Sequence, residues 1–494
     1  MQILVLLVAV FSLFSVQAWG QEPALQPGAV VFSHDFEGEN ALQGWTGARE
    51  FGPGYNSKQA LSVTVPTGEH PGGNSAQITI PVEKLRGYLL YFSAMVRAEN
   101  VSQKPQSWNG IKFMAPVVAP SGNSWPQADI GTGSFAWKRV SFSLRVPQDA
   151  TSLTLLLGLE SVSGTAWFDD VRITVRKLPR VIHPRPLTGP LYTGHAQPRL
   201  RGTMVGHVDE ESLRVLGKEW NANVLRWQLV NYKPQGDRFD RQAYDAWLDG
   251  ELKKMDEALP FCRKYGLLVV VDLHSLPNGG EQNLFNDAEC QKAFVENWQR
   301  IARRYKRVRG IWGYDLANEP IEGVIPENLA DWEELAARTA HAIRAIDRVR
   351  TLIVEPAQGA NPYGLSDFEP IDVPNVVYSV HMYLPHAFTH QGVHDNWSKS
   401  YTYPGEIQGQ HWDKAQLEAA LKPAIDFQKN YGVQIYIGEF SAIRWAPDGS
   451  ACRYLKDVID IFEAHGWDWT YHAFREWSGW SVEYGENKED NTPS

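Results

Sequence analysis

Residues 311–320 read IWGYDLANEP, and residues 435–440 read IYIGEF. Each stretch is an apolar run of strand length that leads to a carboxylate, Glu319 in the first and Glu439 in the second. An apolar strand is buried along its body, while its last residue can face a cleft. The same pattern recurs from Arg199 onward, where such runs alternate with amphipathic, helix-like stretches such as residues 329–343.

The strand-like runs in this part of the chain number eight. They are residues 201–206, 223–227, 267–274, 311–316, 351–355, 376–381, 435–439 and 469–474. Near-continuous apolar strands joined by helical connections indicate a parallel sheet that is covered on both faces. Eight such units within residues 199–484 predict a (β/α)8 barrel and fit a doubly wound sheet less well.

The preceding part of the chain has a different pattern. Residues 27–176 carry short alternating runs separated by Gly, Pro, Asn and Ser, which predicts an all-β, antiparallel sandwich. Residues 177–198 contain five prolines and are expected to be an extended linker. Residues 485–494 form a polar C-terminal tail. The chain is therefore expected to be multidomain.

The N-terminus has the features of an export signal. Residues 3–11 are an apolar run, and the small residues Val16 and Ala18 suit cleavage after Ala18 or Gly20. A buried N-terminal element is the alternative interpretation. We expect residues 1–20 to be a signal peptide and the mature protein to be secreted, either extracellular or periplasmic, with no membrane span remaining.

Charge and composition narrow the class of partner. The net charge of −10 over 494 residues argues against nucleic acid, whose binding needs an excess of Lys and Arg. The 19 Trp, 19 Tyr and 20 Phe suit a large core, and some of them suit stacking on sugar rings. Three cysteines, Cys262, Cys290 and Cys452, make no disulfide framework and at most one bridge. A monomer is the favoured assembly.

Polar or aromatic residues stand at or just beyond six of the eight expected strand ends. They are Arg226, then Asp272 with His274, Asn318 with Glu319, His381 with Tyr383, Glu439, and Glu476 with Trp477. Each one alone is explained equally well as an ordinary loop residue. In a (β/α)8 barrel, however, the carboxyl ends of all strands face one mouth. Six such ends together indicate a single reactive site.

Chemistry suggests a role for each group. A pair of carboxyl groups can cleave a glycosidic bond when one holds a proton and the other is ionised. Arg226 beside Glu439 would favour the ionised form, and Tyr383 could donate a hydrogen bond to the same carboxylate. Asn318 offers an amide to a sugar hydroxyl. Other hydrogen-bonding or stacking candidates are His274, His381, Trp477 and, in the preceding loop, Trp445.

Taken together, these motifs resemble glycoside hydrolase family 5, a cellulase-like family in the large clan of (β/α)8 hydrolases. The resemblance covers about residues 199–484. It implies that Glu319 is the acid/base, that Glu439 is the nucleophile, and that anomeric configuration is retained through a covalent intermediate. It also implies carboxyl groups about 5 Å apart and no cofactor for catalysis. Trp477 and Trp480 compete for the family's eighth-strand tryptophan.

The N-terminal region is similar to carbohydrate-binding modules of the jelly-roll type. The similarity rests on residues 32–38, FSHDFEG, and residues 166–171, AWFDDV. It implies a structural calcium with Asp35, Glu37 and Asp170 as oxygen ligands, although surface acids in turns are the alternative. Trp108 and Trp125 lie in polar surroundings and are candidate sugar platforms, whereas Trp137 and Trp167 lie in strand patterns and are expected in the core.

The leading hypothesis is a secreted, retaining endo-β-1,4-glucanase that acts on a β-linked polysaccharide or oligosaccharide. A β-mannanase or an exo-acting, β-glucosidase-like enzyme of the same fold is the alternative. A non-catalytic carbohydrate-binding protein is the alternative of another class. A nucleotide-using enzyme has no support, because no Gly-rich phosphate loop follows any strand.

Overall fold

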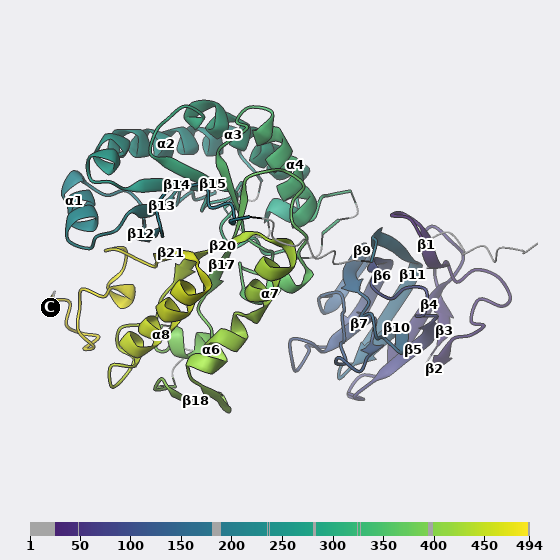
Figure 1. Cartoon of the computed structure of the whole chain (residues 1–494). Helices are drawn as coiled ribbons and strands as arrows, with labels where there is room; N and C mark the ends of the chain where they lie inside the picture. Colours follow the sequence, from purple (N-terminus) through teal and green to yellow (C-terminus); the bar gives the residue numbers. More distant parts are fainter. Residues whose placement is uncertain are drawn as a thin grey trace, which may run out of the picture. The chain divides into compact units, whose positions relative to one another are not determined.

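The computed structural model describes residues 25–47, 49–179, 189–234, 236, 238–279, 283–323, 325–326, 328–393 and 399–492. The chain divides into two compact units, Met1–Arg180 and Val181–Ser494 (Figure 1). The expected signal peptide, residues 1–20, lies outside the described residues, as do residues 180–188 of the expected linker. Within the described ranges, no helix is long and apolar enough to cross a membrane.

The first unit is the predicted β-sandwich, made of two antiparallel sheets. One sheet has the order β3 (Glu50–Gly52), β4 (Ala60–Val65), β11 (Gly164–Lys177), β6 (Leu89–Val101) and β9 (Gly133–Arg145), and β1 (Val30–His34) also pairs with β11. The other has the order β2 (Thr46–Gly47), β5 (Asn74–Ile80), β10 (Ser152–Glu160) and β7 (Gly110–Met114), and β8 (Val117–Val118) pairs with β10.

The core of this unit follows from the period-two pattern of its strands. Leu153, Leu155 and Leu157 of β10 are all fully buried. Successive side chains of a strand point to opposite faces, so these alternate leucines lie on one face. Phe92 and Phe142 stack with ring centroids 4.6 Å apart. Burial of these side chains holds the two sheets together.

The second unit is a closed barrel of eight parallel strands, as predicted. They are β12 (Arg201–Val205), β13 (Val224–Gln228), β14 (Leu268–Asp272), β15 (Ile311–Asp315), β16 (Thr351–Val354), β17 (Val376–Met382), β20 (Gln434–Phe440) and β21 (Asp468–Tyr471). The third and eighth strands end two and three residues earlier than expected. His274 and His472 therefore stand beyond strand ends, in the loops that border the mouth.

Helices and short elements connect the barrel strands (Figure 1). The helices are α1 (Glu210–Lys218), α2 (Arg241–Lys264), α3 (Ala288–Tyr305), α4 (Trp332–Arg344), α5 (His386–Thr389), α6 (Lys414–Ala420), α7 (Lys422–Tyr431) and α8 (Ser450–His465). The 3-10 turns are η1 (Asn283–Phe285), η2 (Pro362–Asp367) and η4 (Ser478–Trp480), and the hairpin is β18 (Gly405–Ile407) with β19 (Gln410–Trp412).

Aspartates begin several of these helices by capping the first turn. The capping side chains, which accept from backbone N–H groups, are those of Asp209, Asp240, Asp287, Asp331 and Asp413. A carboxylate there satisfies an otherwise unpaired donor and complements the helix dipole. The cap at Asp331 explains why α4 begins at Trp332 and not at residue 329.

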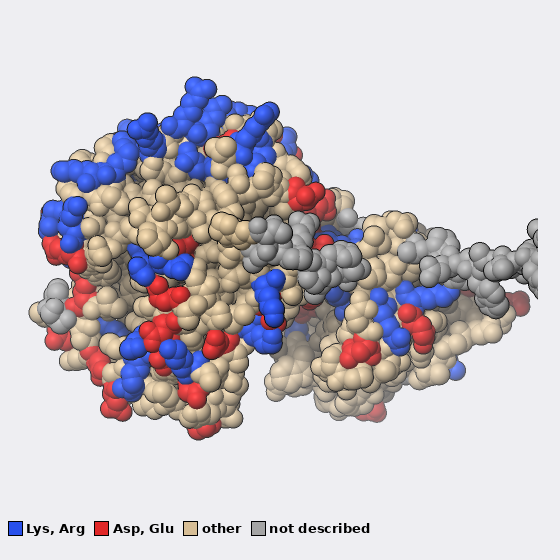
Figure 2. Space-filling view, in the orientation of Figure 1, with Lys and Arg blue, Asp and Glu red and all other residues tan. Residues whose placement is uncertain are grey.

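Charged side chains on the outside of the barrel unit are unevenly spread. Figure 2 shows lysine and arginine gathered over the region where α2 and α3 lie in Figure 1. Several of these cations are paired, for example Arg304 with Asp256 and Arg300 with Asp249. Exposed pairs of this kind contribute little to stability.

The barrel interior has an apolar layer beneath a charged one. The apolar layer comprises Leu200, Val224, Val270, Trp312, Ile353, Val377 and Tyr436. Further along β13, toward the carboxyl ends of the strands, the fully buried Arg226 begins the charged layer. The three cysteines are free thiols: Cys262 and Cys290 are buried, and Cys452 is exposed.

Candidate active site

A single guanidinium organises the charged layer. Arg226 Nη1 lies 2.6 Å from Glu439 Oε1, and Nε lies 2.8 Å from Asp315 Oδ2. Its Nη2 lies 2.9 Å from Glu355 Oε1 and 3.2 Å from Asp272 Oδ1. One cation thus faces four carboxyl groups in a buried place. Burial and the neighbouring acids raise the pKa of Asp315 well above its usual range despite its contact with Arg226.

Glu439 ends β20 and is almost completely buried, yet it is held as the anion. Besides Arg226, it receives a hydrogen bond from the Tyr383 hydroxyl at 2.9 Å. Burial opposes its ionisation, but nearby positive charge outweighs that cost and lowers the pKa of Glu439 well below its usual range. The groups responsible include His381, His472 and Arg226.

Glu319 stands in the loop after β15 with an unusual backbone. Its φ of 44° lies in the left-handed region, which non-glycine residues rarely adopt. The buried Glu355 holds this conformation, because its Oε2 accepts the backbone N–H of Glu319 at 2.7 Å. About a third of the Glu319 side chain is exposed, 33% against 5% for Glu439. Glu319 is therefore the more accessible carboxyl group of the pair.

His381 of β17 connects the two carboxyl groups. Its Nδ1 lies 2.8 Å from Glu319 Oε1, and its Nε2 lies 3.0 Å from Glu355 Oε1. Burial alone would lower its pKa, but the negative charges of Glu355 and Glu439 raise the pKa of His381 well above its usual value. Both ring nitrogens then carry protons, and each donates to a carboxylate.

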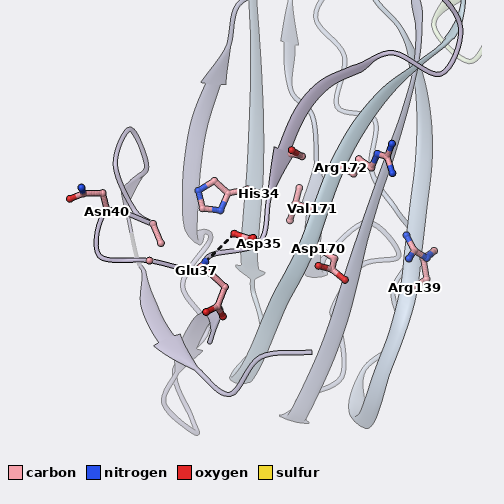
Figure 3. Close-up of a pocket in the computed structure, with 11 residues that line it drawn as sticks. His34, Asp35, Glu37, Asn40, Arg139, Asp170, Val171 and Arg172 are labelled. Carbon is pink, nitrogen blue, oxygen red and sulfur yellow. Dashed lines mark hydrogen bonds between the residues drawn. The ribbon is translucent and has the colours of Figure 1, made fainter. Parts of the chain in front are cut away.

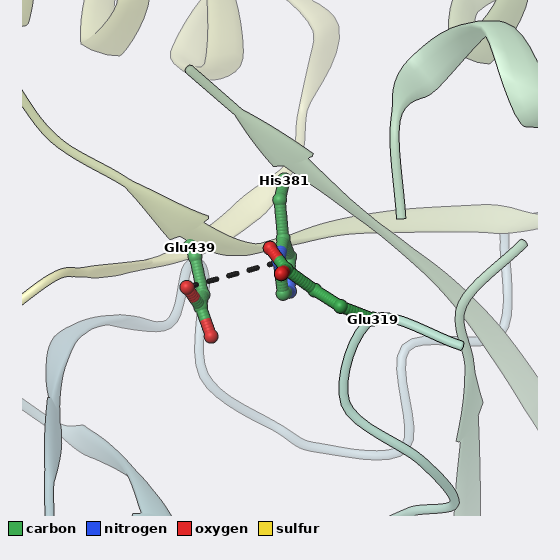
Figure 4. A group of neighbouring side chains, drawn as sticks. All are labelled: Glu319, His381 and Glu439. Atoms are coloured by element: carbon green, nitrogen blue, oxygen red, sulfur yellow. Dashed lines mark hydrogen bonds and ion pairs between the residues drawn. The ribbon is translucent and has the colours of Figure 1, made fainter. Parts of the chain in front are cut away.

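Glu319 and Glu439 face each other across His381 (Figure 4). One oxygen of each glutamate and one nitrogen of His381 lie within 4.8 Å of one another. In the part of the chain that the structure describes, this is the one compact cluster with metal-ligand atoms. Its contacts do not suit a metal, because Arg226 already occupies Glu439 and a protonated imidazole has no lone pair to offer. The arrangement suits a proton donor and a carboxylate nucleophile.

A family model described as cellulase, glycosyl hydrolase family 5, matches residues 193–480. The chain belongs to glycosyl hydrolase family 5. It is thus a glycoside hydrolase, and the relatives below agree.

Among curated relatives, endoglucanase C of Acetivibrio thermocellus is 32% identical over 254 residues, which cover 44% of this chain and 72% of that protein. Cellodextrinase A of Ruminococcus flavefaciens is 27% identical over 237 residues, covering 46% and 68%. A crystal structure of mutant Thermotoga maritima Cel5A with cellobiose has 26% identity and a TM-score of 0.46, covering 58% of this chain and 92% of that one.

The family 5 domain brings most of the sequence-predicted residues together. Arg226, Asn318, Glu319, His381, Tyr383 and Glu439 form one contact network. The Asn318 side-chain oxygen accepts from Arg226 at 3.1 Å, so its NH2 group is the part suited to a sugar hydroxyl. His274 joins through Asp272, which lies 2.9 Å from its Nδ1, and this contact raises the pKa of His274 despite burial.

The predicted stacking residues differ in accessibility. Trp477 is 40% exposed and is suited to stack on a sugar. Trp445 meets it edge-on at 5.7 Å, but the Trp445 N–H donates to the Gln391 carbonyl, and the Lys488 ammonium lies 4.7 Å from its ring centre. Trp480 is only 9% exposed. Trp445 and Trp480 therefore support the mouth, and Trp477 faces solvent.

Sequence reasoning gave no role to Glu355 or His472. Glu355 directly follows β16, and a carboxylate at that place is the same signal that identified Glu319 and Glu439. His472 was assigned to the interior of the eighth strand, yet β21 ends at Tyr471. Its Nδ1 lies 3.5 Å from Glu439 Oε2. A correct strand boundary would have placed His472 at the mouth.

In the first unit, the two candidate sugar platforms are both on the surface. Trp108 is 60% and Trp125 is 62% exposed. The buried Lys112 ties their loops together, because its ammonium donates to the Trp108 carbonyl at 2.5 Å and to Gln127 Oε1 at 2.9 Å. By contrast, Trp167 is buried, as expected, and Trp137 is only partly so.

The predicted calcium ligands line one pocket of about 670 Å³ (Figure 3). Asp35, Glu37 and Asp170 share this pocket with Arg139 and Arg172. Among the described residues these three carboxylates form no compact ligand group, and Glu37 Oε1 already accepts the Gln59 N–H at 2.8 Å. As placed, the residues do not fit a calcium ion.

Proposed function

We propose that the protein is a retaining endo-β-1,4-glucanase that is exported with the help of residues 1–20 and acts as a monomer on β-glucan. The observation that carries the mechanism is the spacing of Glu319 and Glu439, whose oxygens approach within 4.8 Å. Retaining glycosidases have carboxyl groups about 5–5.5 Å apart, while inverting ones need about 6.5–9.5 Å to admit a water molecule.

In this mechanism the two carboxyl groups have successive tasks. Glu319 gives its proton to the glycosidic oxygen as Glu439 attacks the anomeric carbon, which forms a glycosyl ester and releases the leaving sugar. Glu319 then removes a proton from water, and the water cleaves the ester and frees Glu439. Arg226 and Tyr383 hold the nucleophile ionised and in place throughout.

Relatives named endoglucanase favour a glucan chain as the substrate. A relative named cellodextrinase keeps a shorter β-glucan and exo action as the alternative, with β-mannan as the other polymer to test. Product analysis on carboxymethyl-cellulose, lichenan, glucomannan and xylan separates these substrates. Release of reducing ends from mannan and not from glucan would overturn the glucan assignment and leave the mechanism intact.

The acid/base role is tested with Glu319→Ala. Hydrolysis of β-glucan is expected to fall by about 10²–10⁴-fold, because the leaving sugar is no longer protonated. Cleavage of 2,4-dinitrophenyl β-cellobioside, whose leaving group needs no proton, should form the glycosyl-enzyme at nearly the normal rate. Added azide should then release it as β-cellobiosyl azide.

A matched control for this test is Glu334→Ala, which removes an exposed glutamate from the first turn of α4. It is expected to behave as wild type with both substrates. An azide product of α configuration from Glu319→Ala would contradict the assignment of Glu319 as acid/base.

We propose further that the first unit binds polysaccharide through Trp108 and Trp125 and so raises the local concentration of the enzyme. Replacing both with alanine should weaken retention on insoluble cellulose by about tenfold, while hydrolysis of soluble glucan stays unchanged. Phe51→Ala, which removes an aromatic that is 47% exposed in the same unit, is the control. Equal retention of all three proteins would exclude this role.

A further inference from the structure

A second chain of polar contacts reaches Glu439 from the loop that follows β21. His472 Nδ1 lies 2.5 Å from the Tyr383 hydroxyl oxygen, which lies 2.9 Å from Glu439 Oε2. On the other side of the ring, His472 Nε2 lies 3.5 Å from Glu476 Oε2. The four side chains thus form a line from the loop surface to the buried carboxylate.

The count of protons along this line determines its direction. The Tyr383 hydroxyl has one proton, and the ionised Glu439 accepts it. His472 Nδ1 must then donate to the tyrosine oxygen, because two lone pairs cannot share that contact. Nε2 faces Glu476, whose pKa is lowered because the contact with His472 outweighs the effect of burial. A bare nitrogen there would meet a carboxylate, so Nε2 also carries a proton.

We propose that Glu476 and His472 are positioning residues that keep the Tyr383 hydroxyl directed at Glu439. The proposal rests on the proposed function, in which Glu439 is the nucleophile. Glu476 pairs with the doubly protonated ring of His472, and that ring donates to Tyr383, which leaves the tyrosine proton for Glu439. None of these steps requires His472 or Glu476 to touch the substrate.

The surroundings keep this line in place and set its charge. Trp480 packs against the rings of both His472 and Tyr383, at 5.8 and 6.0 Å between centroids. The other charged groups that act on Glu439 from neighbouring strands and loops are Arg226, His381 and His274. Glu476 is the exposed end, with 43% of its side chain accessible.

A similar line serves the other catalytic glutamate. There the buried Glu355 pairs with His381, and His381 donates to Glu319. Glu355 is fully buried, whereas Glu476 lies in a loop at the mouth. The nucleophile can therefore be tuned by changing one accessible loop residue, and the acid/base cannot.

The test measures nucleophilic attack alone, as the rate at which 2,4-dinitrophenyl 2-deoxy-2-fluoro-β-cellobioside inactivates the enzyme across pH. In Glu476→Gln, the His472 ring loses its counter-charge and gives up a proton at lower pH. The alkaline limb of the inactivation rate is then expected to move down by about one pH unit, with a fall of about tenfold above it. Glu483→Gln, a charge-matched change on the same loop, should leave the limb in place.

His472→Asn completes the test, because the asparagine amide can still donate to Tyr383 but cannot reach Glu476. The pH limb should then no longer respond to Glu476→Gln, so that the double variant behaves as His472→Asn alone. Melting temperatures check that each variant is folded. An unshifted limb in folded Glu476→Gln, or effects that multiply in the double variant, would overturn the inference. Failure to label Glu439 in the wild type would instead overturn the proposed function.

Discussion

Replacing Glu439 with glutamine is expected to lower kcat on β-glucan by at least about 10⁴-fold. Glutamine has the same shape and can still accept the hydrogen bonds that Arg226 and Tyr383 now give to the carboxylate. A neutral amide, however, cannot form the glycosyl ester. The loss should therefore appear in kcat, with the dissociation constant for cello-oligosaccharides changed little. Initial rates and calorimetric binding to the same oligosaccharide measure the two quantities.

The stereochemistry of rescue supplies the control. Glu439→Ala leaves space beside the anomeric carbon, and azide entering there should give an α-glycosyl azide, opposite to the product expected from Glu319→Ala. A β product from Glu439→Ala, or kcat within tenfold of wild type for Glu439→Gln, would mean that another group is the nucleophile.

Replacing Arg226 with methionine is expected to destabilise the barrel by about 3–5 kcal/mol. The change removes the one guanidinium in contact with four buried carboxyl groups, those of Asp272, Asp315, Glu355 and Glu439. These acids would then repel one another without water to screen them. Urea unfolding at neutral pH measures the loss. Arg201→Met, which breaks a pair with Glu463 at the exposed rim, should cost less than about 1 kcal/mol.

The same variant should change the response to acid. In the wild type the pKa of Glu439 is depressed, so its ionised form stabilises the fold above the unfolded pKa, and this contribution is lost as the pH falls through the folded value. Without Arg226 the pKa of Glu439 rises. The acid limb of activity should then move to higher pH, and the stability gap to wild type should narrow in acid. A gap no larger than that of Arg201→Met would contradict the role of Arg226.

Much of the fold could be predicted because its determinants are local. An apolar run such as residues 435–439 specifies a buried strand, and the alternation in residues 153–157 specifies a half-buried one. Burial of apolar side chains at a fixed period is the main source of both patterns. Boundaries were less certain, since the end of β21 depends on pairing with its neighbours and not on its own composition.

By itself, the sequence determined the two units, the barrel class and the identity of the two glutamates. Only the tertiary structure decided that Glu355 supports both Glu319 and His381, and that His472 and Glu476 approach the nucleophile. The physical reason is distance along the chain. Strand patterns are complete within a few residues, whereas the contact between Arg226 and Glu439 joins residues 213 positions apart and exists only once the barrel has closed.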